Sequence, residues 1–581
     1  MERFCLKITG ESGAGLLSTG EIIAQAFKAM GYYVVGDREY PSLIKGGHSC
    51  FILNISSEPI HALSEKVDAM LCIDKQSMEA YYKDLKKGGV MVYGYERPLG
   101  VKEIVQEMAE AEVQVVHQMS REIAEAQGGN VLMINIVLAG MLWKTLGLPY
   151  EYIEEEVKKK FASKPKILEI DLRCLKAGYE SVSELIGIFK PAEGRDVGGE
   201  LLINGHHALT LGAIHAGCRA YYAYPMSPSS NILTYMADWS GKTGMLVKQV
   251  EDEISVVNMA LGSMFAGTRT LCATSGGGFD LMTETVSLSG ITETPLVVVV
   301  AQRPGPGTGL PTWTGQGDLN LAMHGGHGEF ARVVVALSDC EDPFELIQHA
   351  FNFAEVYQIP VIVLSEKQTG EMIKNVPMFK EKTVPIKRGL VTNEAEVAKL
   401  APSDRYKITE SGVSKRWLPG ASNSAYYFAN GDEHWEDGSL TEEADEAGLM
   451  YEKRVRKLKT LANDVPEPEV YGEAGGAEIS FVGWGSSLGA VRDIVNWGER
   501  NGVKINYLHY RFVWPLKTEK LEKFFNENKN VHLIEGNNTG QFGRLVRQET
   551  GLTFAGQLLK WNGRPFFLED MMEYVNKNRK K

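Results

Sequence analysis

The chain has 581 residues, of which 44% are hydrophobic, so it can bury large cores and should divide into roughly three or four domains. Its formal net charge of −13 argues against nucleic-acid binding as its main function. The seven cysteines lie far apart without a C-x-x-C pair, which favours reduced thiols in the cytoplasm and argues against an iron–sulfur cluster held by this chain alone.

The sequence predicts neither a signal peptide nor a membrane-spanning helix. The N-terminal FCLKITG lacks the basic and apolar stretches of a signal peptide. The longest apolar stretch, VLMINIVLAGMLW at 131–143, is short for a membrane span, is interrupted by Asn135, and predicts a buried helix. We therefore expect a cytoplasmic protein with no membrane partner.

The first domain opens with a strand, a glycine turn and a helix. A β-rich run at 4–9 meets GESGAG at 10–15, and a helical pattern follows at 16–30. This order points backbone N–H groups at an anion. The glycine spacing is not the dinucleotide fingerprint, however, so a plain turn or another phosphate ligand is favoured over a nicotinamide site. Alternating strand-like and helical runs to about residue 185 predict an α/β sheet.

The middle domain follows a linker at 190–199, and its first strand leads into YPMSPSS at 224–230. Pro225 and Pro228 fix their own φ angles and hold Tyr224 and Ser227 in extended conformations. Such a turn can aim the Ser227 hydroxyl at a ligand. Taken alone, the stretch favours the plain end of a strand.

Two later stretches of this domain also carry groups suited to a binding site. Glu253 directly precedes an apolar, small-residue helical pattern, where an acidic residue is most often a partner of the helix dipole. TSGGG at 274–278 ends a strand, and its glycines allow a flat ligand to approach the backbone closely. In the last domain, GWGSS at 483–487 suits a small anion, although a strand-to-helix turn is the simpler interpretation.

In combination these motifs are specific. With AQRPGPGTGLPTWTGQGDL at 301–319, HGGHGEF at 324–330 and RYKITESGVSKRWLPG at 405–420, they resemble the α-subunit of 2-oxoacid:ferredoxin oxidoreductases. The first domain resembles the γ-subunit of that family, with KGGHS at 45–49 in place of an RGG-type loop.

The resemblance implies a multidomain α/β protein and covers most of the chain. It predicts a γ-type domain at 1–188, a thiamine-diphosphate pyrimidine-binding domain at 200–384 and a transketolase C-terminal-like domain at 385–581.

The resemblance also implies the role of a catalytic glutamate. Glu253 is chosen over Glu251 because a glycine, Gly262, follows it at the family's spacing of nine residues. Its carboxyl group would hydrogen-bond a nitrogen of the pyrimidine ring of thiamine diphosphate and act in proton transfer. The cofactor, in turn, is the electron sink for loss of CO₂.

Other residues are implied in binding. Ser227, Arg303 and Thr312 would bind the substrate, and Arg303 would offer its carboxylate a bidentate guanidinium fork. The implied cofactor contacts are Tyr224, Pro225, Glu253, Ser275 and Gly276.

Two departures from the family pattern affect the prediction. His206 and His207 replace an Asn-Glu pair, and Trp313 stands where many relatives carry arginine. Loss of that cation predicts a weaker preference for substrates with a second carboxylate, unless a β-subunit supplies the charge.

The implied reaction is oxidative decarboxylation of a 2-oxoacid to acyl-CoA and CO₂, with coenzyme A as cosubstrate and ferredoxin as electron acceptor, or the reverse. The chain lacks the G-D-G…N-N pattern for Mg²⁺ and diphosphate, and it lacks cluster-binding cysteines. An obligate β-subunit would therefore carry Mg²⁺ and a [4Fe-4S] cluster, in an αβ or (αβ)₂ assembly. Two alternatives stay open: a noncatalytic scaffold or binding subunit, and a thiamine-dependent decarboxylase without a redox partner.

Overall fold

The structure, a computed structural model, describes residues 3–11, 15–41, 47–95, 102–183, 195–380, 384–422 and 425–579. Parts of the GESGAG and KGGHS stretches therefore lie outside the described residues. The chain forms two compact units. The first comprises Met1–Ile203, Glu371–Met378 and Phe566–Glu573, and the second comprises Asn204–Gly370, Phe379–Pro565 and Tyr574–Lys581. The three-domain division remains a prediction.

The first unit is built on an eight-stranded mixed sheet in the order β6-β5-β4-β1-β3-β2-β14-β7. Its strands are β1 (Phe4–Glu11), β2 (Tyr33–Glu39), β3 (His48–Ser56), β4 (Val67–Cys72), β5 (Leu85–Tyr93), β6 (Gln114–His117), β7 (Glu200–Asn204) and β14 (Ile373–Pro377). Strand β14 comes from far along the chain, and Asn375 Oδ1 in it accepts a hydrogen bond from the Val34 amide of β2 at 2.8 Å.

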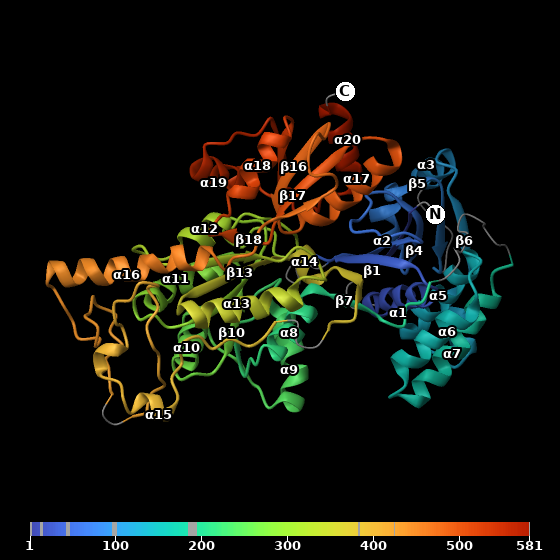
Figure 1. Cartoon of the computed structure of the whole chain (residues 1–581). Coiled ribbons are helices and arrows are strands. Elements are labelled where there is room, and N and C mark those ends of the chain that lie inside the picture. The colour runs from blue at the N-terminus through green and yellow to red at the C-terminus, as the bar shows by residue number, and fades with distance from the viewer. Residues whose placement is uncertain are drawn as a thin grey trace. The chain divides into compact units, whose positions relative to one another are not determined.

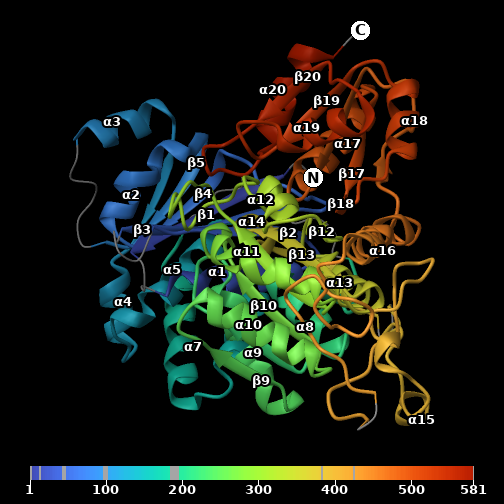
Figure 2. The ribbon, with the colours of Figure 1, turned by 90° about the vertical axis from the view of Figure 1, so that its left-hand side faces the viewer.

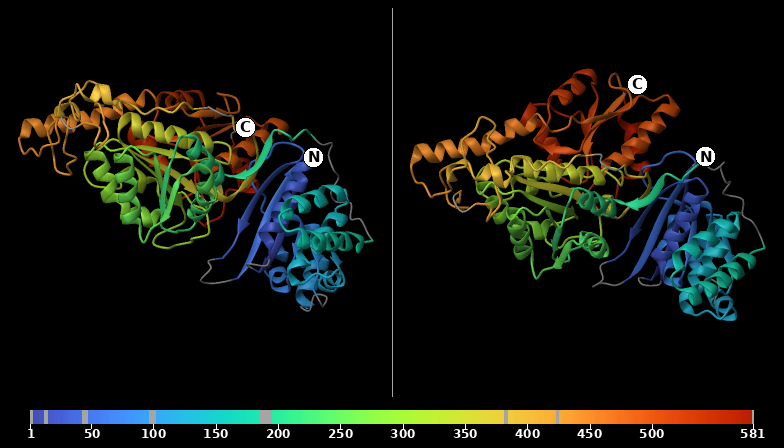
Figure 3. Two further views of the ribbon diagram at one scale, coloured as in Figure 1. Left: turned by 90° about the horizontal axis from the view of Figure 1, so that it is seen from below. Right: turned by 60° about the horizontal axis from the view of Figure 1, so that its bottom comes forward.

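Seven helices belong to this part of the chain: α1 (Leu16–Ala29), α2 (Lys75–Tyr81), α3 (Lys102–Glu110), α4 (Ser120–Ala126), α5 (Ile134–Thr145), α6 (Tyr150–Phe161) and α7 (Pro165–Glu180). Figure 3 shows α5, α6 and α7 grouped beside the blue strands. The prediction of a buried helix at 131–143 is confirmed for α5, nearly all of which is buried, whereas Val131–Met133 forms a 3₁₀ turn in which Val131 and Leu132 are exposed. Among the described residues no single helix is long and apolar enough to cross a membrane, although α4 and the segment Val131–Thr145 pass that test as a pair bent by 118°.

The second unit contains a seven-stranded sheet in the order β18-β12-β13-β11-β10-β8-β9, parallel except for β18. Its strands are β8 (Ala220–Ala223), β9 (Leu246–Gln249), β10 (Thr270–Thr274), β11 (Leu296–Gln302), β12 (Val333–Ala336), β13 (Pro360–Glu366) and β18 (Phe512–Trp514). The associated helices are α8 (Gly205–His215), α9 (Ser230–Thr243), α10 (Glu253–Phe265), α11 (Gly276–Ile291), α12 (Leu319–His324), α13 (Pro343–Tyr357) and α14 (Lys367–Glu371).

Strand β11 explains why this sheet is covered on both faces. Every residue of β11 is buried, and its side chains alternate between two hydrophobic clusters. Val298 and Val300 pack with residues of α10, α11 and α12, whereas Val297 and Val299 pack with residues of α8 and α13. A continuous apolar run of this kind is typical of a parallel strand between two helical layers (Figure 1).

A five-stranded sheet completes the second unit, in the order β15-β17-β16-β19-β20. Figure 2 shows this sheet with α17, α18 and α19 around it. The strands are β15 (Glu469–Tyr471), β16 (Ile479–Trp484), β17 (Ile505–Tyr510), β19 (Val531–Glu535) and β20 (Gly556–Leu559), and the helices are α17 (Ser487–Asn501), α18 (Glu519–Glu527) and α19 (Gln541–Thr550). The last helix, α20 (Leu568–Asn578), is divided between the two units. One hydrophobic cluster joins Val482 and Trp484 of this sheet to α12, so the two sheets of the unit share a core.

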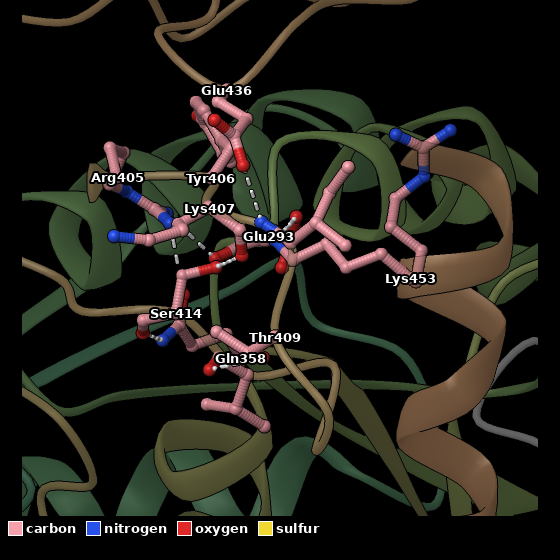
Figure 4. Close-up of polar contacts among 12 residues, drawn as sticks. Glu293, Gln358, Arg405, Tyr406, Lys407, Thr409, Ser414, Glu436 and Lys453 are labelled. Atoms are coloured by element: carbon pink, nitrogen blue, oxygen red, sulfur yellow. Dashed lines mark hydrogen bonds and ion pairs between the residues drawn. The ribbon is translucent and has the colours of Figure 1, made fainter. Parts of the chain in front are cut away.

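In sequence between β14 and β15 the chain forms an arm, which contains the short helix α15 (Glu394–Val397) and ends in the helix α16 (Ala444–Ala462). The arm is anchored by a buried ionic cluster shown in Figure 4. The Glu293 carboxylate forms ion pairs with Lys453 Nζ at 2.5 Å and with Lys457 Nζ at 2.6 Å, and all three side chains are buried. Arg405 donates to the carbonyl oxygens of Thr292 and Glu293, where α11 ends, so its charge also opposes the negative end of that helix.

Candidate active site

The predicted site residues lie at one edge of the seven-stranded sheet. Strands β13, β11, β10 and β8 are parallel neighbours, so their carboxyl ends lie side by side. Tyr224 follows β8, Ser275 follows β10 and Arg303 follows β11. Ligands of α/β proteins bind at this edge, because loops and helix N-termini converge there.

The YPMSPSS turn directly contacts the predicted arginine. Arg303 Nη1 donates a hydrogen bond to the Ser227 carbonyl oxygen at 2.7 Å, so two of the three predicted substrate residues are joined. Tyr224 and Pro225 are exposed beside them, whereas Thr312 is buried. The turn therefore does more than end β8, because it also holds the guanidinium group of Arg303, which follows β11.

The glycines of TSGGG make room for two carboxyl groups. A Cβ atom added to Gly278 would come within 2.5 Å of Glu253 Oε1, and one added to Gly276 would come within 2.6 Å of Asp318 Oδ2. Gly277, by contrast, has open space around it. The N-terminus of α11 is thus flanked by carboxylates from α10 and from the loop before α12, which the positive end of the helix dipole favours.

Three buried polar atoms around this helix N-terminus have no hydrogen-bond partner among the described residues: Glu253 Oε1, Ser275 Oγ and Asp318 Oδ2. A buried carboxyl or hydroxyl oxygen without a partner is costly, and native proteins rarely keep one without a function. The side chain of Glu253 is buried, whereas that of Glu251 is exposed. The arrangement suits a flat polar ligand that supplies the missing hydrogen bonds.

Asp318 is the residue of this site that the sequence did not single out, although it stands in the quoted QGDL. Burial and, to a lesser extent, the charge of Asp280 raise the pKa of its carboxyl group to about 6, and Arg303 opposes the rise. The only local signal was an acidic residue at the end of a glycine-rich loop, which alone indicates nothing. Its importance comes from the contact with Gly276 on another element.

The loop from Arg303 to Asp318, called the site loop below, is held by the five-stranded sheet. Gln316 Nε2 donates to Glu366 Oε1 at 2.9 Å and to the Trp484 carbonyl at 3.0 Å, and Gln316 Oε1 accepts from the Gly536 amide at 2.6 Å. Asn537 Nδ2 donates to the Gln316 carbonyl at 2.9 Å. The site loop is therefore held by two sheets at once.

The same contacts explain the GWGSS motif. The Ser486 amide, at the start of α17, donates to Glu366 Oε1 at 3.1 Å, and Thr314 Oγ1 donates to Glu366 Oε2 at 2.8 Å. Burial raises the pKa of Glu366 while these donors lower it. The N-terminus of α17 thus faces the carboxylate of Glu366 and not a bound anion, which supports the interpretation of GWGSS as a strand-to-helix turn.

We expect Gln316→Ala to lower the free energy of unfolding of the second unit by about 2–4 kcal/mol, because it removes three hydrogen bonds at once, to Glu366, Trp484 and Gly536. Calorimetry measures the change. The matched control is Gln541→Ala, which removes exposed hydrogen bonds to Gly317 of the same loop and to Asn320 of α12 and should cost less than about 1 kcal/mol. Equal effects of the two substitutions would contradict the special role of Gln316.

The two departures from the family pattern have structural partners. His206 is fully buried, contacts Asn231 Oδ1 at 2.6 Å and Ser365 Oγ at 2.8 Å, and burial lowers its pKa to about 4. The ring of His207 stacks on that of Tyr235 at 4.6 Å. Trp313, in the site loop, stacks with Arg564. Within the described residues, no group of three or more His, Cys, Asp or Glu side chains is placed to hold a metal ion.

Comparisons with known proteins agree with this fold. The family model described as "Pyruvate flavodoxin/ferredoxin oxidoreductase, thiamine diP-bdg" matches residues 211–442, and "Pyruvate ferredoxin/flavodoxin oxidoreductase" matches residues 5–181. The 2-oxoacid:ferredoxin oxidoreductase subunit alpha of a Sulfolobus species is 30% identical over 98% of this chain and 96% of its own length. The 2-oxoglutarate oxidoreductase subunit KorA of Mycobacterium tuberculosis is 28% identical over 99% of this chain and 91% of its own.

A solved structure extends the likeness to the whole fold. The 2-oxoglutarate:ferredoxin oxidoreductase from Magnetococcus marinus, with 2-oxoglutarate, coenzyme A and succinyl-CoA bound, has a TM-score of 0.91 at 28% identity and covers 100% of both chains. Fold, site and family models together define an oxidoreductase subunit with a thiamine-diphosphate-binding domain. The chain belongs to the 2-oxoacid:ferredoxin oxidoreductase family, and its relatives are α-subunits. The resemblance found in the sequence and the prediction of an α/β multidomain fold are both confirmed.

Proposed function

We propose that this chain is the α-subunit of a CoA-dependent 2-oxoacid:ferredoxin oxidoreductase and that it supplies the pyrimidine half of the thiamine-diphosphate site. The observation that carries the proposal is the group of three unpartnered buried oxygens at the N-terminus of α11, on Glu253, Ser275 and Asp318. A ligand with several hydrogen-bonding atoms on a flat ring satisfies such a group.

The residues fit the cofactor in this way. Glu253 Oε1 would accept or donate the hydrogen bond to a pyrimidine nitrogen, and Ser275, Gly276, Tyr224 and Pro225 would hold the ring beside it. Gly278 leaves the space in which the Glu253 carboxyl group lies. Thiamine diphosphate supplies the electron sink for loss of CO₂ from a 2-oxoacid.

Substrate binding falls to the YPMSPSS turn and the site loop. Arg303 presents a planar fork to the 2-oxoacid carboxylate, and its bond to the Ser227 carbonyl fixes its direction. The hydroxyl groups of Ser227 and Thr312 bind the same end of the substrate. Coenzyme A is the acyl acceptor; its presence with succinyl-CoA in the Magnetococcus marinus structure supports this choice.

A β-subunit completes the enzyme. We assign to it Mg²⁺, the diphosphate site and a [4Fe-4S] cluster that passes electrons to ferredoxin, in an αβ or (αβ)₂ assembly. An exposed apolar rim beside the site, formed by Tyr224, Ile254, Leu281 and Leu310, supports a partner docked at this edge. The seven cysteines are free and buried, which supports a location in the reducing cytoplasm.

The test is anaerobic purification of the chain together with the β-subunit encoded in the same genome, followed by viologen reduction with a panel of 2-oxoacids. We expect reduction that requires both the 2-oxoacid and coenzyme A. Release of CO₂ without coenzyme A or an electron acceptor would favour the non-redox decarboxylase. Inactivity of the intact complex with every 2-oxoacid would favour the scaffold.

We expect Asp318→Asn to lower kcat/KM at least about tenfold while raising the melting temperature by about 2–5 °C at pH 7.5. The raised pKa of about 6 means that the folded state holds a proton which the unfolded chain releases near pH 4. Stability therefore falls as the pH rises from about 4 to 6, and asparagine removes this cost. Scanning calorimetry at pH 4.5 and 7.5 measures it; a variant less stable at pH 7.5 contradicts the assignment.

A further inference from the structure

A second arginine reaches the site loop from the five-stranded sheet. Arg564, in the turn after β20, lies with its guanidinium carbon 3.3 Å from the centre of the Trp313 ring. Stacking of a planar guanidinium on an indole is favourable and leaves the N–H edges of the guanidinium directed outward. Trp313 therefore serves as a platform for a cation that comes from elsewhere in the chain.

The position of this arginine is fixed by the residue before it. The Thr314 amide donates to the Gly563 carbonyl at 3.2 Å. Gly563 has a φ of 80°, and an added Cβ would come within 2.9 Å of Trp313 Cβ, so this close approach requires glycine. On the other side of the turn, Lys560 Nζ donates to the Pro565 carbonyl at 2.8 Å. The turn and the site loop thus form one packed unit.

The charge of Arg564 is not neutralised within the described part of the chain. Its backbone amide donates to Asn562 Oδ1, but its guanidinium forms no ion pair with a described carboxylate. The other site cation, Arg303, has both a carbonyl partner and the nearby charge of Asp318. A half-buried, stacked guanidinium without a counter-ion is suited to bind an anion bidentately.

The fold of the site loop links the Trp313 segment, on which this cation lies, to the neighbourhood of Arg303. The Leu310 amide donates to the Pro304 carbonyl at 2.9 Å, and an added Cβ at Gly315 would lie 3.2 Å from Pro304. The segment that carries Trp313 therefore folds back on the residue next to Arg303. Two guanidinium groups, one from each sheet, lie at this loop.

We propose that Arg564, held on Trp313, binds the distal carboxylate of the substrate and makes the enzyme selective for 2-oxodicarboxylates. The inference rests on the proposed function, because it places the 2-oxoacid carboxylate on Arg303. It replaces the sequence-based expectation that Trp313 weakens the preference for a second carboxylate: the cation is present, but a different segment supplies it.

The test compares two substrates of equal length, 2-oxoglutarate and 2-oxopentanoate, in the α–β complex. The Arg564→Met variant keeps an unbranched side chain on the Trp313 ring and removes the charge. It should lower kcat/KM for 2-oxoglutarate about 10- to 100-fold, mainly by raising KM. The value for 2-oxopentanoate should change less than about threefold. Arg564→Lys, which keeps a charge but loses the planar fork, should lie between wild type and the methionine variant. Arg547→Met, on the exposed face of α19, is the matched control and should behave as wild type.

Each outcome decides between named alternatives. Equal loss with both substrates shows a structural role and overturns the inference, and melting temperatures of the variants check this. A rise confined to the KM for coenzyme A assigns Arg564 to a phosphate of that cosubstrate and also overturns it. If the wild-type complex is active with 2-oxopentanoate but not with 2-oxoglutarate, the inference about Arg564 is wrong and the proposed function stands. Inactivity of the wild-type complex with every 2-oxoacid overturns the proposed function itself.

Discussion

Glu253→Gln lowers kcat for viologen reduction by about 10²- to 10⁴-fold in the α–β complex, if Glu253 is the proton-transferring group of the site. Glutamine has nearly the same shape and keeps one hydrogen-bonding oxygen, but its amide cannot take up or release a proton at that position. The substitution therefore removes the chemistry and preserves the packing against Gly278. Initial rates at saturating 2-oxoacid and coenzyme A measure the effect.

The chain offers a matched control two residues earlier. Glu251 is exposed and accepts a hydrogen bond from Ser255 Oγ at 2.8 Å, so Glu251→Gln should change kcat less than about twofold. The amount of thiamine diphosphate and of β-subunit that co-purifies should be the same for both variants. A Glu253→Gln complex as active as wild type would sink the catalytic assignment.

Glu293→Gln is expected to lower the free energy of unfolding of the second unit by about 3–5 kcal/mol, because it leaves buried cations without their carboxylate. Lys453 and Lys457 both contact this one side chain, and Arg405 lies beside it (Figure 4). Scanning calorimetry measures the change. Glu169→Gln, in an exposed pair with Arg173, is the control and should cost less than about 1 kcal/mol.

The same cluster predicts a pH dependence. Burial lowers the pKa of Lys453 from 10.5 to about 7, with Glu293 opposing the shift. Between these two values the unfolded chain binds more protons than the folded chain, so this group makes stability rise with pH across the window. Removing Glu293 lowers the lysine pKa further and should extend the rise in stability to lower pH. A loss below about 1 kcal/mol and an unchanged pH profile would contradict the assignment of a buried ionic anchor.

Much of the fold was predictable because it depends on local patterns. The periodic pattern of α1 and the apolar stretch of α5 follow from residue spacing within one element, and the structure confirms both helices. The α/β class follows from the alternation of strand-like and helical runs. Strand β14 could not be placed in this way, because its neighbours β2 and β7 come from a distant part of the chain.

The candidate site was predicted where motifs carry it. The positions of Ser227, Glu253, Ser275 and Arg303 at strand ends follow from the order of elements, since parallel strands end at one edge. Their roles remain proposals. Asp318 could not be singled out, because its neighbour Gly276 belongs to another element and a single acidic residue in a loop has no pattern.

The sequence by itself determined the class of protein, the order of its elements and the residues that meet at the sheet edge, because these depend on local propensity and on motifs of fixed spacing. Only the tertiary structure decided which side chains lack partners, that Gln316 and Glu366 hold the site loop to the five-stranded sheet, and that Arg564 lies on Trp313. Those properties arise from contacts between segments far apart in the chain, and burial and hydrogen-bond geometry exist only once the segments have packed.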